Sequence, residues 1–251
     1  MNAGLHPLVG GFNDAAAYDA GRPRYDVRVA EELIARLELA PAAPVLELGA
    51  GTGQLSDALL AAGLDLTAVE PLGPTRDMLC AAIGAERVRE GRAEAIPMKD
   101  GSVDAVFAAD AFHWFDETRA MPEIKRVLRP RGGVGILRMI VHQPERPWTK
   151  DLGRVLMASR PEHPAFTDRG AAAALEEDPA FGPVSATSLS TPAVLNRTQL
   201  LAWIASFSWV AVLPEDERAQ LLERAGELLE SHSVDQAEYD LLAQIWIARL
   251  H

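Results

Sequence analysis

The sequence lacks most features that mark secreted, membrane-spanning and metal-binding proteins. It has one cysteine, Cys80, so an internal disulfide cannot form and a reducing compartment is expected. No apolar run reaches membrane-spanning length, and no basic start followed by an apolar stretch marks a signal peptide. The histidines lie far apart without metal-ligand spacing, and no G-x-S-x-G turn marks a nucleophilic serine. We therefore expect a cytoplasmic protein without a metal site.

Positive charge is also scarce. The 251 residues include 24 Lys and Arg against 36 Asp and Glu, which gives a formal net charge of -12. This balance argues against nucleic acid and anionic membrane surfaces as partners, because both attract basic proteins. An acidic small molecule remains compatible, since a local arginine cluster could bind it. The length and the hydrophobic share of 48% fit one α/β domain with a sizeable core.

The most informative segment that is present covers residues 45–53, Val-Leu-Glu-Leu-Gly-Ala-Gly-Thr-Gly. A short apolar strand leads there into a glycine turn, which lets a backbone bend sharply and approach a ligand. The dinucleotide pattern G-x-G-x-x-G is only nearly matched, because its third glycine is replaced by Gln54. A strand before the turn and a helix after it place the turn at the carboxyl end of a parallel sheet, where open α/β folds bind ligands.

Three acids, Glu47, Glu70 and Asp110, lie at the ends of predicted strands, and no Lys or Arg occurs between residues 41 and 75. A pyrophosphate favours cations and helix N-termini over carboxylates. A ligand with an ammonium, a sulfonium and a ribose diol fits this pattern better. The carboxylate of Glu70, about 20 residues past the glycines, could accept hydrogen bonds from both ribose hydroxyls.

Residues 45–53, together with residues 69–71, 91–94, 107–116 and 126–133, resemble a class I S-adenosylmethionine-dependent methyltransferase of the small-molecule, type 11-like kind. The resemblance extends over roughly half of the chain, residues 12–142. It implies an α/β fold with a Rossmann-like seven-stranded mixed sheet, mostly parallel with an antiparallel last strand, helices on both faces and a helical cap insertion. It also implies S-adenosyl-L-methionine as the cofactor, a small-molecule methyl acceptor as the partner, and a monomer or homodimer.

The resemblance implies a cofactor site at the strand ends, covered by the N-terminal segment. Each of its residues also has a simpler interpretation, such as a plain strand–helix turn, a solvated acid or a core aromatic. Their occurrence at successive strand ends favours the site. The expected cofactor-binding residues are Tyr18, Arg22, Tyr25, Glu47, Gly49, Ala50, Gly51, Gly53, Glu70, Pro71, Met78, Ala93, Glu94, Asp110, Ala111, Phe112, His113 and Trp114.

Methyl transfer needs alignment and exclusion of water more than covalent chemistry by the protein. His113 directly follows the fourth predicted strand and is a candidate general base, because an ordinary histidine has a pKa of about 6.5. The alternative is that His113 only packs or hydrogen-bonds near the cofactor. Arg22, Arg24 and Arg138 could bind an acidic acceptor. For Arg138, a salt bridge at the strand end is the slightly favoured alternative.

We expect a single domain over residues 1–251. Its parts are an N-terminal lid (1–27), a cofactor-binding core (28–142), an acceptor-side cap insertion (143–181) and C-terminal strands and helices (182–251). The expected strands are residues 45–48, 64–69, 87–89, 103–109, 134–141, 183–191 and 239–250. A hydrophobic acceptor cavity could be shaped by Trp148, Trp203, Phe207 and Trp209. Helix periodicity explains Trp203 and Phe207 equally well.

Two other functions stay open. A non-catalytic S-adenosylmethionine-binding protein is compatible with the sequence, because catalysis by alignment requires few particular side chains. A nicotinamide-dependent oxidoreductase is disfavoured by Gln54, by the acid at Glu47 and by the missing basic residues around the glycine turn.

Overall fold

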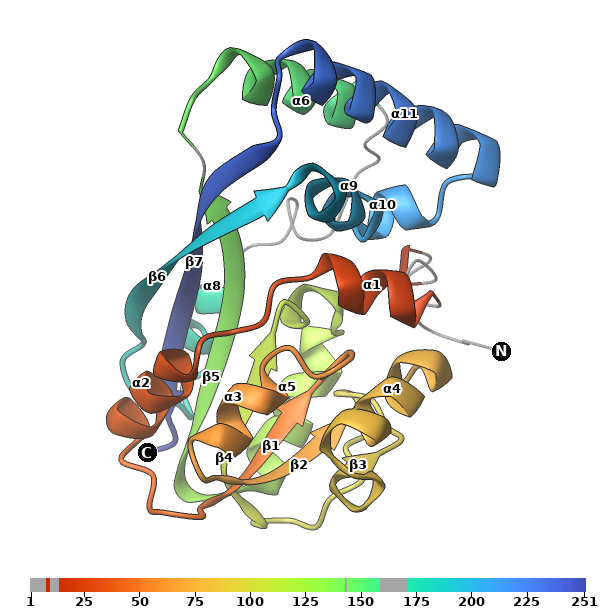
Figure 1. Ribbon diagram of the computed structural model, residues 1–251. Helices are drawn as coiled ribbons and strands as arrows, with labels where there is room; N and C mark the ends of the chain where they lie inside the picture. Colours follow the sequence, from red (N-terminus) through yellow and green to blue (C-terminus); the bar gives the residue numbers. More distant parts are fainter. Residues whose placement is uncertain (1–7, 10–13, 143, 159–170) are drawn as a thin grey trace.

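The computed structural model describes residues 8–9, 14–142, 144–158 and 171–251 (Figure 1). Its centre is a seven-stranded sheet with the order β3-β2-β1-β4-β5-β7-β6. Strands β1 to β5 are parallel, whereas β7 runs antiparallel to both of its neighbours. The predicted mixed sheet is therefore confirmed. The strands are β1 (Pro44–Leu48), β2 (Asp65–Val69), β3 (Val88–Arg89), β4 (Val103–Ala109), β5 (Leu128–His142), β6 (Ser185–Asn196) and β7 (Gln236–Arg249).

Helices cover both faces of the sheet, as the resemblance implied. Helices α2 (Val27–Leu37), α3 (Ser56–Ala61) and α4 (Gly73–Ile83) pack their apolar side chains on one face, and α5 (Glu117–Val127) and α8 (Ala171–Glu176) pack on the other. Two short 3-10 helices, η2 (Ala85–Arg87) and η3 (Phe112–Trp114), lie in the connections. None of the described helices combines the length and the apolar composition of a membrane span.

The fifth and sixth strands are longer than the sequence indicated. Pro130 and the glycine pair at 132–133 predicted a break before residue 134, but β5 already begins at Leu128. A register shift between Val103 and Ala105 of β4 absorbs the irregular residues, so pairing continues on both sides of them. At its other end β5 continues to His142, because β7 stays paired with it beyond the end of β4.

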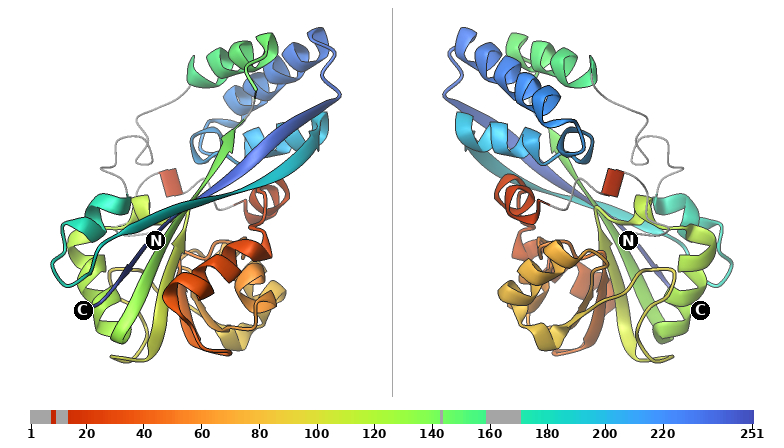
Figure 2. Two further views of the ribbon diagram at one scale, coloured as in Figure 1. Left: turned by 90° about the vertical axis from the view of Figure 1, so that its left-hand side faces the viewer. Right: turned by 90° about the vertical axis from the view of Figure 1, so that its right-hand side faces the viewer.

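These long strand ends support a third apolar core, separate from the two cores on the faces of the main sheet. It is formed by helices α6 (Pro147–Ala158), α9 (Arg197–Ala205), α10 (Ser208–Ala211) and α11 (Glu215–Ser231) with the first residues of β7. Figures 1 and 2 show these helices gathered around the far ends of β5, β6 and β7. We call them the cap. The predicted insertion 143–181 falls partly outside the described residues, so its role as a unit stays a prediction.

The N-terminal helix α1 (Ala15–Gly21) lies between the cap and the main sheet (Figure 1). Gly21 packs so closely on α9 that an added Cβ would lie 2.3 Å from the carbonyl oxygen of Ala202. On the opposite side, the carboxylate of Asp19 accepts hydrogen bonds from Thr52 Oγ1 at 2.7 Å and Gln54 Nε2 at 3.3 Å. Helix α1 therefore joins the glycine turn to the cap.

Candidate functional site

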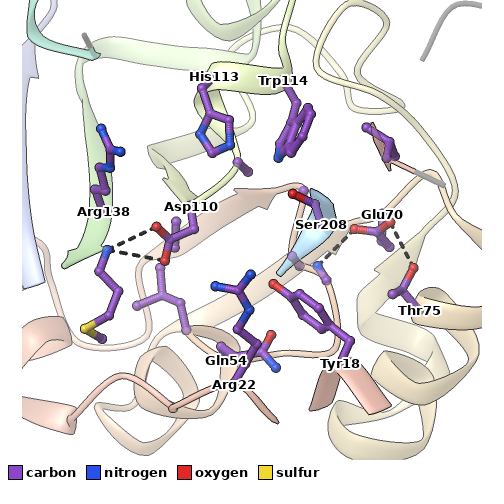
Figure 3. Close-up of a pocket in the computed structure, with 18 of the residues that line it drawn as sticks. Tyr18, Arg22, Gln54, Glu70, Thr75, Asp110, His113, Trp114, Arg138 and Ser208 are labelled. Carbon is purple, nitrogen blue, oxygen red and sulfur yellow. Dashed lines mark hydrogen bonds between the residues drawn. The ribbon is translucent and has the colours of Figure 1, made fainter. Parts of the chain in front are cut away.

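A cavity of about 490 Å³ lies where the parallel strands end, between the main sheet and the cap (Figure 3). The volume is in the ordinary range for a small-ligand site. Most of the residues expected from the sequence line it: Tyr18, Arg22, Tyr25, Glu47, Gly49, Ala50, Gly51, Glu70, Pro71, Ala93, Glu94, Asp110, Ala111, His113 and Trp114. Strand ends that lie far apart in the sequence thus meet at one edge of the sheet.

Three expected residues lie outside this lining. Phe112 is 3% exposed and packs in the core edge-to-face with Phe115, 5.7 Å between ring centroids. Met78 is half-buried on α4. Gly53 closes the turn, with its N–H donating to the carbonyl of Ala50 and its φ at 99°. For Gly53 the sequence signal reflects the backbone conformation of the turn rather than a position on the cavity surface.

The glycine turn forms the floor of the cavity. The N–H groups of Gly49 and Ala50 both donate to the carbonyl of Val69, at 2.9 and 3.2 Å, which fixes the turn against the end of β2. Gly49 has φ 65°, and a Cβ on it would lie 2.8 Å from the Cβ of Ala111. A side chain at this position would therefore be strained and would also overlap the segment that follows β4.

Gly49→Ala is expected to be at least about 1 kcal/mol more destabilising than Gly63→Ala. Both changes force an alanine into positive φ, which costs about 1–2 kcal/mol, but Gly63 has no heavy atom within 4 Å of the added Cβ. The difference therefore isolates the overlap with Ala111. Urea denaturation of the two variants measures it, and equal losses would show that the turn has room for a side chain.

Glu70 is the best connected acid in the cavity. It is 5% exposed, and it accepts hydrogen bonds from Gly51 N at 2.9 Å, Leu72 N at 3.0 Å and Thr75 Oγ1 at 3.1 Å. Burial raises the pKa of Glu70, while these three donors favour the charged form. A carboxylate has about four acceptor positions. Glu70 therefore holds the glycine turn and keeps acceptor capacity for a ligand.

Asp110 ends β4 in an unusual backbone conformation, with φ 49°. Its carboxylate accepts hydrogen bonds from Tyr25 Oη at 2.8 Å and from Met139 N at 3.1 Å. Burial raises the pKa of Asp110, and the hydrogen bond from Tyr25 and the charges of Arg22 and Arg138 oppose that rise. A strained backbone held by several partners is common at functional sites.

Glu47 differs from the other two acids and corrects an expectation. It is 1% exposed and accepts a hydrogen bond from Ser56 Oγ at 2.6 Å. Because the single hydroxyl offsets little of its desolvation, burial raises the pKa of Glu47 to about 8. Glu47 is therefore mostly protonated at neutral pH. The sequence argument treated it as an uncompensated charge, whereas its main contact is with α3.

The cavity is also lined by arginines, which the absence of Lys and Arg between residues 41 and 75 did not lead us to expect. Arg22, Arg92 and Arg138 reach it from other segments. Arg92 faces Glu94 at 3.3 Å. The Nη2 of Arg22 donates to the carbonyl of Ser206 at 3.2 Å, while its buried Nε has no hydrogen-bond partner among the residues that the structure describes. The Arg22 guanidinium lies near the Tyr18 ring, 5.2 Å from its centroid.

Arg24 lies apart from this group. It bridges Asp19 at 2.9 Å and Asp57 at 2.7 Å, and so ties α1 to α3. The structure therefore does not bring Arg24 to the cavity as a binder of an acidic acceptor. Arg24 is not among the lining residues, and its guanidinium is paired with Asp19 and Asp57.

The described part of the cap lines the cavity through α9 and α10. Trp203, Phe207 and Trp209 line it, as the sequence suggested, together with Ser208, which no sequence signal marked. Trp148 instead packs in the cap core at 8% exposure. Beyond the end of β4, the segment of β5 from Arg138 to Val141 completes this wall.

Comparisons with known proteins place the chain in a family. A family model described as a methyltransferase domain matches residues 46–136. An uncharacterized methyltransferase of Mycobacterium tuberculosis is 37% identical over 216 residues, which cover 86% of this chain and 84% of the relative. An uncharacterized methyltransferase-like protein of Schizosaccharomyces pombe is 31% identical, with the same two shares covered.

The fold is also similar to that of a solved structure. A protein of Anaeromyxobacter dehalogenans, provisionally described as a type II methyltransferase, matches with a TM-score of 0.65. The match covers 91% of this chain and 96% of that one at 23% sequence identity, so it bears on the fold alone.

Proposed function

This chain belongs to the class I S-adenosylmethionine-dependent methyltransferases, and from that premise we propose that it transfers a methyl group from S-adenosyl-L-methionine to a small molecule bound beside the cap. The observation that carries the proposal is the cavity itself. Its core wall has the glycine turn and the acids Glu70 and Asp110, and its opposite wall is aromatic. The proposal covers oxygen, nitrogen and carboxylate acceptors.

The residues present fit this cofactor. Glu70 keeps acceptor capacity for a ribose hydroxyl, and the glycine floor leaves space that a Cβ would fill. Pro71 and Ala93 offer apolar surface for the adenine. The buried Nε of Arg22, which no described residue accepts from, could donate to the methionine carboxylate. Asp110 supplies an acceptor for the ammonium group.

The protein's contribution to the reaction is positioning. When bound, S-adenosylmethionine supplies a methyl carbon activated by its sulfonium, which the acceptor atom attacks as the carbon–sulfur bond breaks and the electron pair stays on sulfur. The aromatic faces of Tyr18 and Trp114 tolerate positive charge, and the cap together with α1 reduces access of water. Orientation of two reactants in one closed cavity is a large source of rate enhancement.

His113 becomes a catalytic residue if the acceptor atom loses a proton. It follows β4 and lines the cavity beside Trp114, 4.8 Å between ring centroids. His113→Ala is then expected to lower turnover by about 100-fold or more and to remove the acidic limb of the pH profile. Unchanged binding of S-adenosylhomocysteine would assign His113 to the acceptor, whereas a lowered affinity would assign it to the cofactor contacts expected from the sequence. An unaltered turnover and pH profile would remove His113 from the mechanism.

The proposed reaction is tested by labelled methyl transfer. Full-length protein is incubated with methyl-labelled S-adenosylmethionine and, in separate reactions, with mixtures of small organic acids, phenols and amines, with added protein or with nucleic acid. The products are separated by chromatography. We expect label in one small-molecule class, and no label when the Glu70→Gln variant replaces the wild type. Label only on added protein or nucleic acid would contradict the proposal.

A further inference from the structure

A second cavity of about 220 Å³ adjoins the one described above, which we now call the first cavity. It is a little under half as large, and four residues line both cavities: Arg22, Pro23, Val141 and Trp203. Protein interiors are close-packed, and voids larger than a water molecule are few. A space of this size that shares part of its wall with the candidate site is therefore best explained as an extension of that site.

The second cavity lies between the ends of three strands and the helices α1 and α9. Val141 of β5 and Leu241 of β7 are paired across the sheet, so their side chains share a face, and Leu195 of β6 lines the cavity with them. Ala20 of α1 and Gln199 of α9 also line it, and both are exposed, whereas Leu241 is buried. The cavity thus extends from the covered strands toward the surface where α1 packs on α9 (Figure 1).

The lining of the second cavity is apolar apart from Arg22 and Gln199. The Arg22 guanidinium lies 5.2 and 5.6 Å from the ring centroids of Tyr18 and Phe207. Both rings line the first cavity and not the second, so the charge lies toward the first cavity and the alkyl stem of Arg22 is left for the second. The side chain of Gln199 is part of the capping box that begins α9.

The groups assigned to the methyl donor lie elsewhere. Gly51, Glu70 and Asp110 line the first cavity, and within the described ranges no acid and no residue of the glycine turn lines the second. S-adenosylmethionine has polar or charged groups in both its adenosine and its methionine part, and their burial without hydrogen-bond partners is unfavourable. An aliphatic chain needs no such partners and is stabilised by leaving water. The second cavity therefore fits a part of the acceptor better than a part of the donor.

We propose that the methyl acceptor is an amphiphile, with its polar reacting group beside the cofactor in the first cavity and an aliphatic chain in the second cavity. This inference rests on the proposed function and names its substrate class. The chain passes the junction that Pro23, Val141 and Trp203 form between the two cavities, and it packs on Leu195 and Leu241. These side chains then determine which chain lengths the protein accepts.

Calorimetry with two homologous series of probes tests the proposal. Full-length protein saturated with S-adenosylhomocysteine is titrated with straight-chain alkanoates from butanoate to decanoate and, separately, with straight-chain amines from butylamine to decylamine, all below their critical micelle concentrations. Two head groups are used because the reacting atom is not presupposed. In at least one series, each added methylene should tighten binding by up to about fourfold, which corresponds to about 0.8 kcal/mol per buried methylene, until the second cavity is filled.

Variants at neighbouring positions locate the effect. Leu195→Trp fills the second cavity from β6 and should abolish the dependence on chain length, while the affinity for S-adenosylhomocysteine stays within about twofold and shows that the variant folds. Val194→Trp is the matched control, because Val194 precedes Leu195 on the same strand, is 56% exposed and lines neither cavity. It should keep the wild-type dependence. Ala20→Trp obstructs the second cavity from α1 and repeats the test if Leu195→Trp does not fold.

Three outcomes overturn the inference while the proposed function stands. Wild-type protein could bind S-adenosylhomocysteine and yet bind no probe, or bind short and long probes of both series equally. The dependence on chain length could persist in Leu195→Trp and Ala20→Trp, which would place the chain outside the second cavity. It could also be lost in Val194→Trp, which would make it a general property of β6. Failure of the wild type to bind S-adenosylhomocysteine would instead remove the proposed function, and this inference with it.

Discussion

Glu70→Gln is expected to lower the affinity for S-adenosylhomocysteine by about 100-fold or more, the largest effect on binding predicted for a single side chain. Loss of one charge-assisted hydrogen bond from a ribose hydroxyl, at about 1.5–3 kcal/mol, accounts for up to about that factor, and loosening of the glycine turn adds to it. The amide nitrogen would also face one of two donors that now meet a carboxylate oxygen, the N–H of Gly51 at Oε2 or the N–H of Leu72 at Oε1. Isothermal titration calorimetry measures the change.

The matched control for this variant is Glu90→Gln. Glu90 follows β3, its side chain is 74% exposed and it pairs with Arg76 at 3.2 Å, so the same chemical change occurs outside the cavity lining. The affinity of Glu90→Gln for S-adenosylhomocysteine should stay within about twofold of the wild type. The lost ion pair is exposed, and such pairs contribute only about 0–1 kcal/mol to stability, so the fold that forms the cavity is retained. Equal affinity of Glu70→Gln and wild type would place the ribose elsewhere.

The unfolding free energy is expected to fall as the pH rises from about 5 to 8, and Glu47→Gln should remove much of this fall. The ordinary pKa of the carboxyl is 4.5, whereas burial raises the pKa of Glu47 to about 8 in the folded protein. Between these values the unfolded chain releases a proton that the folded chain keeps. Stability that is fully present below pH 4.5 is therefore lost progressively until pH 8.

The size of this effect is set by the pKa difference. At about 1.4 kcal/mol per pKa unit, the loss is at most on the order of 5 kcal/mol. Urea unfolding at a series of pH values measures it. A smaller slope of the same sign should remain in Glu47→Gln, because burial also raises the pKa of Glu70 and Asp110. An identical slope in wild type and Glu47→Gln would show that Glu47 ionises in the folded protein.

The sequence predicted those parts of the site that depend on local patterns. The glycine turn, the acid ending β2 and the acid ending β4 each follow an apolar strand directly, and parallel strands bring their carboxyl ends together. The placement of Glu70 and Asp110 therefore required only the strand order. Strand β4 was predicted with its observed ends, because a mostly apolar run begins at Val103 and the acid Asp110 directly follows it.

Contacts between segments that are distant in the sequence could not be predicted from local patterns. The neutralisation of Glu47 depends on complete burial against Ser56, which the spacing does not reveal. Trp148 and Trp203 have similar helical surroundings in the sequence, yet only Trp203 lines the cavity, since the packing of the cap helices decides which face turns inward. The continuation of β5 beyond β4 likewise depends on its pairing with β7.

The central claim is that the cavity between the glycine turn and the cap binds the methyl donor rather than a dinucleotide. Calorimetric titration of the full-length protein with S-adenosylhomocysteine and, separately, with NAD tests it most directly. The account predicts one-to-one binding of S-adenosylhomocysteine that Glu70→Gln weakens, with no measurable binding of NAD. Binding of NAD in the absence of any heat from S-adenosylhomocysteine would contradict it.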